Sequence, residues 1–149
     1  FVYSNYPFNF KDELLISGGA ALGMKKGDGV VAGEMLLGTI YEVFRETALV
    51  RTIFDARTRF AVRIGEKGAD ALLVGGSTPR VTLIAKNADI REGDVIYAVY
   101  PGIPYGMPVG TLVRRIPSSD SLFDESAIQI PLNPADLQMV AILPSLSSE

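Results

Sequence analysis

Cysteine and histidine are both absent from the 149 residues of the chain. Without cysteine there is no disulfide, no thiolate nucleophile and no thiolate metal site. Without histidine the chain lacks the commonest general base and the commonest transition-metal ligand, so a Ser-His-Asp triad is impossible. Only serine–lysine, paired-carboxylate or carboxylate–metal chemistry stays open, and no Ser-x-x-Lys motif occurs.

The sequence also lacks an uninterrupted apolar run long enough to cross a bilayer, which takes about 20 residues. No signal peptide is visible. The sequence begins at Phe1 rather than at methionine, so we expect a fragment, and an anchor could have been lost upstream. The 14 basic and 17 acidic residues give a net charge of −3 with no basic patch. Nucleic acid is therefore not an expected partner.

Short runs rich in β-branched residues are what the chain does have, each bounded by Gly, Pro, Asp or Asn. Some of them alternate polar and apolar residues, as half-buried strands do; examples are 81–84 and 111–114. The runs predict strands at 13–17, 29–32, 35–44, 47–54, 60–64, 71–74, 81–85, 94–100, 108–116, 127–132 and 139–143.

Helical periodicity is almost absent; one turn is indicated at 133–137, where Asn suits an N-cap and Pro the first helical position. The sequence therefore predicts an all-β fold of two small β-barrels with short antiparallel strands. We expect an extended lead-in over 1–10, a first barrel over 11–58 and a second over 59–149. The last strand could return to the first barrel.

A weak internal repeat supports two similar halves, although chance would also produce it because Gly-Asp turns are common. Each half has a charged residue, a Gly-Asp turn, and then a strand with an apolar-Gly-Thr-apolar motif, where glycine allows a bend or a close backbone approach. The residues predicted to form these structural turns are Gly27, Asp28, Gly38, Gly93, Asp94, Gly106 and Gly110.

Carboxylates gather at residues 120–125, where they could bind Ca²⁺ or act as acid and base. The segment lacks the Asp-x-Asp-x-Asp-Gly spacing of a calcium loop, so a solvated loop is the preferred interpretation. We expect no catalytic residue, no metal, no cofactor and no enzymatic activity.

A rigid loop in the second half is the candidate interaction site. Residues 101–108 include three prolines and two glycines. Proline fixes φ and so lowers the entropy lost on binding. Apolar and aromatic residues in or beside the loop are the predicted contacts: Tyr100, Ile103, Tyr105 and Met107. A tight turn whose aromatics cap the barrel is the alternative.

Several short motifs follow one another in a fixed order along the chain. In the first half they are LISGG (15–19), GMKKGDGVV (23–31), LGTIYEV (37–43) and TALVRTIFD (47–55). In the second half they are GDVI (93–96), PYGMPVGTL (104–112) and PADLQMVAIL (134–143). Together they cover nearly the whole chain, and in this order they resemble the MreC family of rod shape-determining proteins.

The resemblance implies a non-catalytic scaffold of the cell-wall elongation machinery that controls cell shape. The implied partners are a class B penicillin-binding protein, RodA, and the MreD and MreB system, together with further copies of the chain. It also implies an extracytoplasmic location, held by an upstream membrane anchor. A periplasmic adaptor barrel of a membrane-fusion or secretion system is the alternative function, since such barrels use similar Gly-Asp turns.

Overall fold

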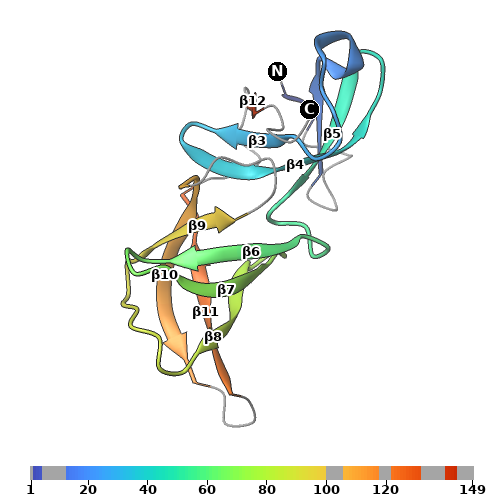
Figure 1. Cartoon of the computed structure of the whole chain (residues 1–149). Coiled ribbons are helices and arrows are strands. Elements are labelled where there is room, and N and C mark those ends of the chain that lie inside the picture. The colour runs from blue at the N-terminus through green and yellow to red at the C-terminus, as the bar shows by residue number, and fades with distance from the viewer. Residues whose placement is uncertain (1, 5–12, 100–105, 118–121, 132–139, 144–149) are drawn as a thin grey trace.

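Twelve strands and one short 3-10 helix make up the described part of the chain (Figure 1). The computed structural model describes residues 2–4, 13–99, 106–117, 122–131 and 140–143. The elements are β1 (Val2–Ser4), β2 (Glu13–Ser17), η1 (Gly19–Leu22), β3 (Gly29–Ala32), β4 (Met35–Val43), β5 (Thr47–Thr52), β6 (Arg59–Ile64), β7 (Ala69–Val74), β8 (Arg80–Ala85), β9 (Val95–Val99), β10 (Pro108–Ile116), β11 (Phe123–Gln129) and β12 (Ala141–Leu143).

The first sheet has six strands in the order β1-β2-β5-β4-β3-β12, and every neighbouring pair is antiparallel. Strand β12 comes from the far end of the chain and pairs with β3, with Ala141 opposite Val31 and Leu143 opposite Gly29. The second half is therefore tied back onto the first by its last described strand.

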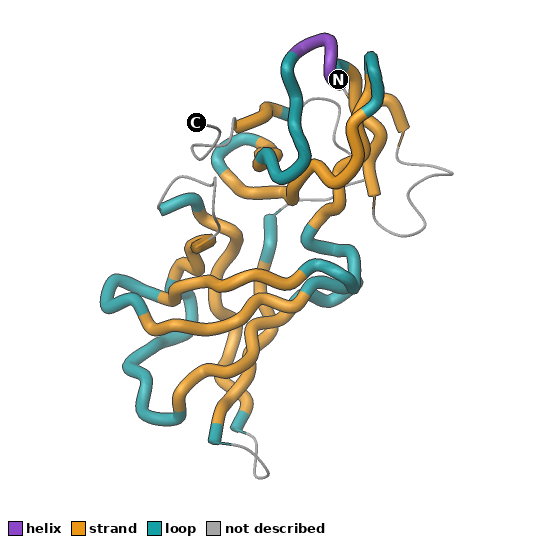
Figure 2. The backbone as a smooth tube through the Cα atoms, turned by 45° about the vertical axis from the view of Figure 1, so that its right-hand side comes forward, coloured by secondary structure: helices purple, strands orange, loops and turns teal. Residues whose placement is uncertain are grey.

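The second sheet is a closed barrel in the order β10-β11-β8-β7-β6-β9, again antiparallel, and β9 closes it by pairing with β10. Figures 1 and 2 show this barrel below the first sheet. The predicted all-β fold with almost no helix is confirmed, but two closed barrels are confirmed only in part. Among the described residues the edge strands β1 and β12 have three residues each and pair on one side only, so the first sheet is not closed there.

Strand boundaries agree with the sequence pattern where alternation is strong, as in β2 and β5, whose alternate residues are buried. Strand β1 was not expected, because the aromatic-rich segment 1–10, with Pro7 in its middle, predicted only an extended lead-in. The predicted helical turn at 133–137 lies outside the described residues. The domain boundaries at 10 and 58 stay a prediction.

The hydrophobic core consists of two clusters of buried side chains that are linked through Phe54. One lies within the first sheet and contains fully buried Leu14 and Val50. The other fills the barrel but also takes in Leu36 and Ile53 from the first sheet and its connection. Phe54 packs against both clusters. Burial of apolar surface therefore holds the two sheets together as well as each one separately.

Residues 53–58 carry the chain from β5 into the barrel, and hydrogen bonds fix them on both sides. The Gly75 amide, just after β7, donates to the Thr58 carbonyl (2.8 Å). The Thr58 hydroxyl donates to the Thr52 carbonyl (2.7 Å). Gly75 has room for no side chain, since a Cβ there would lie 2.3 Å from the Asp55 carbonyl oxygen. This connection, which we call the join, is packed rather than loose.

A charged network anchors the join to the first sheet. Asp55 is buried and accepts hydrogen bonds from the Arg57 amide (2.8 Å), Nε (2.9 Å) and Nη2 (2.7 Å). Arg57 Nη2 also reaches Glu13 Oε2 on β2 (2.6 Å), to which the Tyr41 hydroxyl donates (2.6 Å). Burial and the hydrogen bond to Glu13 raise the pKa of Tyr41 to about 12. The guanidinium of Arg51 stacks over the Tyr41 ring at 4.5 Å.

The first Gly-Asp turn is held by its own aspartate. Asp28 Oδ2 accepts from the Lys25 amide (3.0 Å), and the Asp28 amide donates to the Lys25 carbonyl (3.1 Å). The turn then docks on β4: the Gly27 amide donates to the Ile40 carbonyl (2.8 Å), and the Ile40 amide donates to the Asp28 carbonyl (2.9 Å). Gly27 has a φ of +92°, which favours glycine.

The second Gly-Asp turn makes the same four hydrogen bonds. Asp94 Oδ2 accepts from the Arg91 amide (2.8 Å), and the Asp94 amide donates to the Arg91 carbonyl (3.1 Å). The Gly93 amide donates to the Leu112 carbonyl, and the Leu112 amide to the Asp94 carbonyl, both at 2.8 Å. The weak sequence repeat therefore corresponds to one structural unit used twice, once in each sheet.

Gly38 and Gly110, grouped with the turn residues in the sequence, lie inside strands β4 and β10 instead. A Cβ on Gly38 would lie 2.2 Å from the Arg51 carbonyl oxygen on β5. On Gly110 it would lie 2.6 Å from Ile128 Cγ2 and 2.7 Å from the Gln129 carbonyl oxygen. Both glycines therefore permit a close approach of neighbouring strands.

The expected solvated loop at 120–125 is wrong in its second half, because β11 begins at Phe123. Asp124 is buried there, and Lys86 Nζ donates to its Oδ1 at 2.8 Å. Arg115 Nε lies 3.5 Å from the other carboxylate oxygen. An interpretation of Asp-Glu from local sequence misses these two cations, because Lys86 comes from the turn after β8 and Arg115 comes from β10.

Leu83 is the one non-glycine residue with positive φ among the described residues, at +59°. It lies in β8 where the pairing with β11 shifts register between Asp124 and Ser126, and its side chain is half exposed. A bulky L-residue in this left-handed conformation is strained.

We expect Leu83→Asn to stabilise the protein by about 1 kcal/mol, because asparagine tolerates the left-handed region. Equilibrium urea unfolding measures the change. Val113→Asn is the control, since Val113 is similarly exposed on a strand without positive φ. A loss of stability in Leu83→Asn equal to that of the control would contradict the assignment of strain.

Candidate protein-interaction site

The predicted interaction loop lies largely outside the described residues, since Tyr100, Ile103 and Tyr105 fall there. Met107 is described, and its side chain packs against the barrel core rather than standing free. Its carbonyl accepts a hydrogen bond from the Ala98 amide (2.9 Å). Gly106 is exposed, with a φ of +90°.

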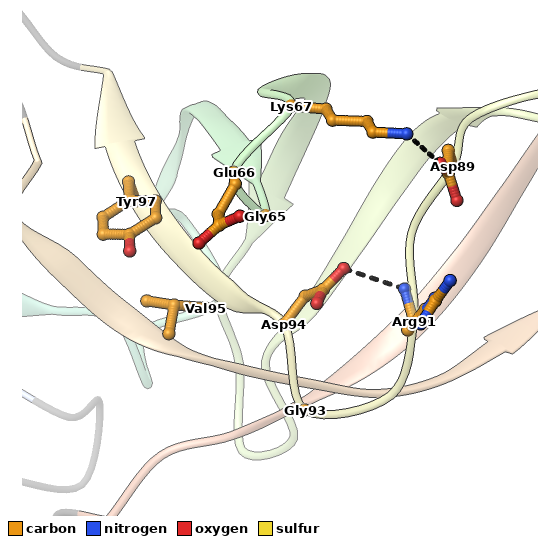
Figure 3. Close-up of a pocket in the computed structure, with 9 residues that line it drawn as sticks. All are labelled: Gly65, Glu66, Lys67, Asp89, Arg91, Gly93, Asp94, Val95 and Tyr97. Carbon is orange, nitrogen blue, oxygen red and sulfur yellow. Dashed lines mark hydrogen bonds and ion pairs between the residues drawn. The ribbon is translucent and has the colours of Figure 1, made fainter.

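A cleft of about 410 Å³ opens beside the described end of this loop. Three segments form it: the β6–β7 turn, the second Gly-Asp turn and strand β9 (Figure 3). Its lining residues are Gly65, Glu66, Lys67, Asp89, Arg91, Gly93, Asp94, Val95 and Tyr97. A smaller hollow of about 150 Å³ shares Gly65, Glu66 and Tyr97 with the cleft and extends to Gly106.

The two turns that border the cleft hold each other. The Gly65 amide donates to the Val95 carbonyl (2.9 Å), which ties the β6–β7 turn to the start of β9. Gly65 has a φ of +75°, and a Cβ there would lie 3.0 Å from Asp94 Oδ2. Asp94 thus fixes its own turn and lies against its neighbour, so the cleft is preformed.

Charges of both signs line the cleft. Lys67 Nζ donates to Asp89 Oδ2 in an ion pair across one side of it (Figure 3). This hydrogen bond raises the pKa of Lys67 and lowers that of Asp89. Both side chains are exposed, so water screens the pair and it contributes little to folding. A charged group of a binding partner could therefore replace either Lys67 or Asp89 in this ion pair at little cost.

The structure brings Gly93, Asp94 and Gly106 to this one side of the barrel, whereas Gly27, Asp28 and Gly38 belong to the first sheet. Glu66 and Lys67 were not among the residues predicted for this site. A signal was present, because the run Gly65-Glu66-Lys67-Gly68 is a charged turn flanked by glycines. Its proximity to the second Gly-Asp turn depends on strand order, which local patterns do not give.

The described residues contain no group of three or more potential metal-ligating side chains. Within the same residues no helix is long and apolar enough to cross a membrane. The described part of the chain is an all-β domain with one closed barrel, a repeated Gly-Asp turn and a cleft lined by charges of both signs.

The sequence profile of the rod shape-determining protein MreC barrel core matches residues 2–144, so the chain belongs to the MreC family. Among curated proteins none matches the chain. Family membership favours the cell-shape interpretation over the membrane-fusion adaptor.

Solved MreC structures share the fold. MreC of Listeria monocytogenes is 20% identical, with a TM-score of 0.87 over 97% of this chain and 73% of that one. MreC from Pseudomonas aeruginosa is 27% identical, with a TM-score of 0.74 over 87% and 88% of the two chains. A third similar chain comes from a complex between Penicillin-Binding Protein (PBP2) and MreC from Helicobacter pylori; it is 16% identical, with a TM-score of 0.70 over 87% and 83%.

Proposed function

We propose that the chain is a non-catalytic scaffold of the cell-wall elongation machinery that controls cell shape by binding peptidoglycan synthases. Membership of the MreC family carries this proposal. Similarity to a chain from a penicillin-binding protein complex adds support. The proposed partners are a class B penicillin-binding protein, RodA, and the MreD and MreB system. Self-association, an extracytoplasmic location and an upstream membrane anchor belong to the same proposal.

We place contact with the penicillin-binding protein at the cleft and the adjoining loop at 101–108. Tyr97 offers a large, stiff surface with a polar tip, a side chain favoured at interfaces. The glycine-bordered turns are preformed, so little conformational freedom is lost there on binding. A stable interface needs about 800 Å² from each partner, so contacts must extend beyond the cleft to the loop.

Ile103→Ala and Tyr105→Ala test this placement. We expect each to weaken binding to the extracytoplasmic region of a class B penicillin-binding protein by about tenfold or more, because anchor side chains carry most of an interface's energy. Binding is measured in solution by calorimetry, and melting of each variant is measured alongside. Val113→Ala, on an exposed part of β10, is the matched control and should bind normally.

Unchanged affinity in variants that melt normally would remove the loop from the interface. A large fall in melting temperature would instead assign the loop a structural role, as a turn that caps the barrel.

A further inference from the structure

An apolar hollow of about 450 Å³ opens on the outside of the barrel, next to the cleft. Small and apolar side chains of β7, β8, the segment after β8 and β11 line it: Ala69, Leu83, Ala85, Ala88 and Phe123. Leu83 is 50% and Phe123 39% exposed. We call this feature the barrel hollow. Exposed apolar surface that is gathered in one place is typical of a site where another molecule binds.

Strand β8 holds Leu83 in the hollow against the preference of its own backbone. Val81 and Ile84 are both fully buried although they are three positions apart, and the pairing of β8 with β11 shifts register at this point. Leu83 takes the left-handed φ of +59° and lines the hollow instead of the core. Strain of this kind persists only where the surrounding structure imposes it, and it is common at functional sites.

Charges of both signs surround the barrel hollow in equal number. Lys67 and Asp89 form an ion pair and line both the hollow and the cleft. Asp70 also lines the hollow and pairs with Arg63 at 3.2 Å. All four side chains are exposed, so either pair can exchange partners at little cost. The surface is neutral as a whole and therefore does not repel a copy of itself.

A projecting apolar side chain stands beside the hollow. Leu122 directly precedes Phe123 and is 81% exposed, more than any other large apolar side chain among the described residues. Strand β11 begins here, at the end of the barrel opposite the first sheet (Figure 1). A surface with a projection next to a hollow can pair with itself about a twofold axis, because each copy then places its projection in the other's hollow.

From these observations we infer that the barrel hollow is the face through which two copies of the chain associate. Leu122 of each copy enters the hollow of the other and packs on Leu83 and Phe123, while the surrounding charges pair across the axis. A stable interface needs about 800 Å² from each partner, so the contact must extend beyond the hollow over the outside of the barrel. The choice of a second copy rests on the self-association in the proposed function, whereas the place of contact comes from the hollow itself.

Leu83→Asn tests this face because it separates association from stability. The wild-type chain should associate reversibly in sedimentation equilibrium at concentrations up to about 1 mM. Leu83→Asn should weaken this association by about tenfold or more, although the variant is expected to be more stable to urea. Val113→Asn is the matched control: Val113 is exposed on β10 outside the hollow, so the variant should associate like the wild type.

Two results of this experiment would overturn the inference. One is a wild-type chain that stays monomeric over the whole range of concentration. The other is a Leu83→Asn variant that associates as tightly as the wild type or as the Val113→Asn control, which would place self-association on another face.

Single cysteines locate the contact, because the chain has none of its own. Leu122→Cys should give covalent dimers with a flexible bismaleimide, at a concentration at which the wild-type chain associates. Leu22→Cys is the matched control on η1 of the first sheet, where Leu22 is 75% exposed, and it should give few. Equal yields from the two variants would contradict contact at the hollow.

Binding of Leu83→Asn to the extracytoplasmic region of a class B penicillin-binding protein, measured by calorimetry, separates this inference from the proposed function. Normal binding by a variant that no longer self-associates supports the hollow as the face between copies. Weaker binding with unchanged self-association would make the hollow part of the synthase interface and overturn the inference. A wild-type chain that self-associates through the hollow but does not bind the penicillin-binding protein would contradict the proposed function alone.

Discussion

Gly38→Ala is expected to lower the free energy of unfolding by about 3 kcal/mol, at the upper end of what overpacking costs. The added Cβ would lie 2.2 Å from the Arg51 carbonyl oxygen and 2.8 Å from the Thr52 Cα. Both atoms are backbone of the neighbouring strand β5, in the middle of the first sheet, so relief requires that the strands separate. Equilibrium urea denaturation followed by circular dichroism measures the change.

Two other glycines serve as controls for Gly38→Ala. Gly33→Ala should cost about 1 kcal/mol, because Gly33 has a φ of +64° but open space around it. Gly110→Ala should fall between the two, since its nearest backbone atom, the Gln129 carbonyl oxygen, is at 2.7 Å rather than 2.2 Å and its other close contact, Ile128 Cγ2, belongs to a side chain. A Gly38→Ala variant as stable as Gly33→Ala would show that the strands separate easily.

Asp55→Asn is expected to destabilise the protein by about 2 kcal/mol at neutral pH, because it weakens charge-assisted hydrogen bonds at a buried position. Burial alone would raise the pKa of Asp55, but the side-chain and backbone hydrogen bonds of Arg57 hold it below its ordinary value of 3.8. The stabilisation is therefore complete above that value and is lost as the pH falls through the lower folded-state pKa.

Unfolding followed from neutral pH into acid tests this linkage. The wild-type protein should lose stability below about pH 4, and Asp55→Asn should lose less over the same interval. Asp70→Asn is the control: Asp70 pairs with Arg63 at 3.2 Å, but its side chain is 85% exposed, so the change should be within about 0.5 kcal/mol. Identical acid profiles for wild type and Asp55→Asn would refute the role assigned to the network.

The all-β fold followed from local patterns because alternation is a property of neighbouring residues. The segment 13–17 was expected to be a strand, and β2 occupies Glu13–Ser17 with alternate residues buried. Closure of the barrel depends on the pairing of β6 with β9, in which Val62 lies opposite Ala98. These residues are far apart in the sequence, and no local pattern in either strand indicates which strand it pairs with. The first sheet was expected to close likewise, and no local pattern distinguished an open edge from a paired one.

In the candidate site, too, interactions between residues near in sequence were predictable and interactions between distant residues were not. The Gly-Asp turns were visible because the aspartate acts on its own turn, three residues back. The cleft was not, because Lys67 and Asp89 meet across two loops separated by 22 positions. Asp124 was misplaced for the same reason, since its partner Lys86 comes from 38 positions away.

The join has a mechanical consequence. Arg57 is bonded to Glu13 of the first sheet, Thr58 is bonded to Gly75 of the barrel, and Phe54 packs into both cores. A flexible tether would let each sheet turn on its own. This connection instead makes the chain a rigid spacer, so a force applied to the barrel would reach the first sheet at a fixed distance and angle.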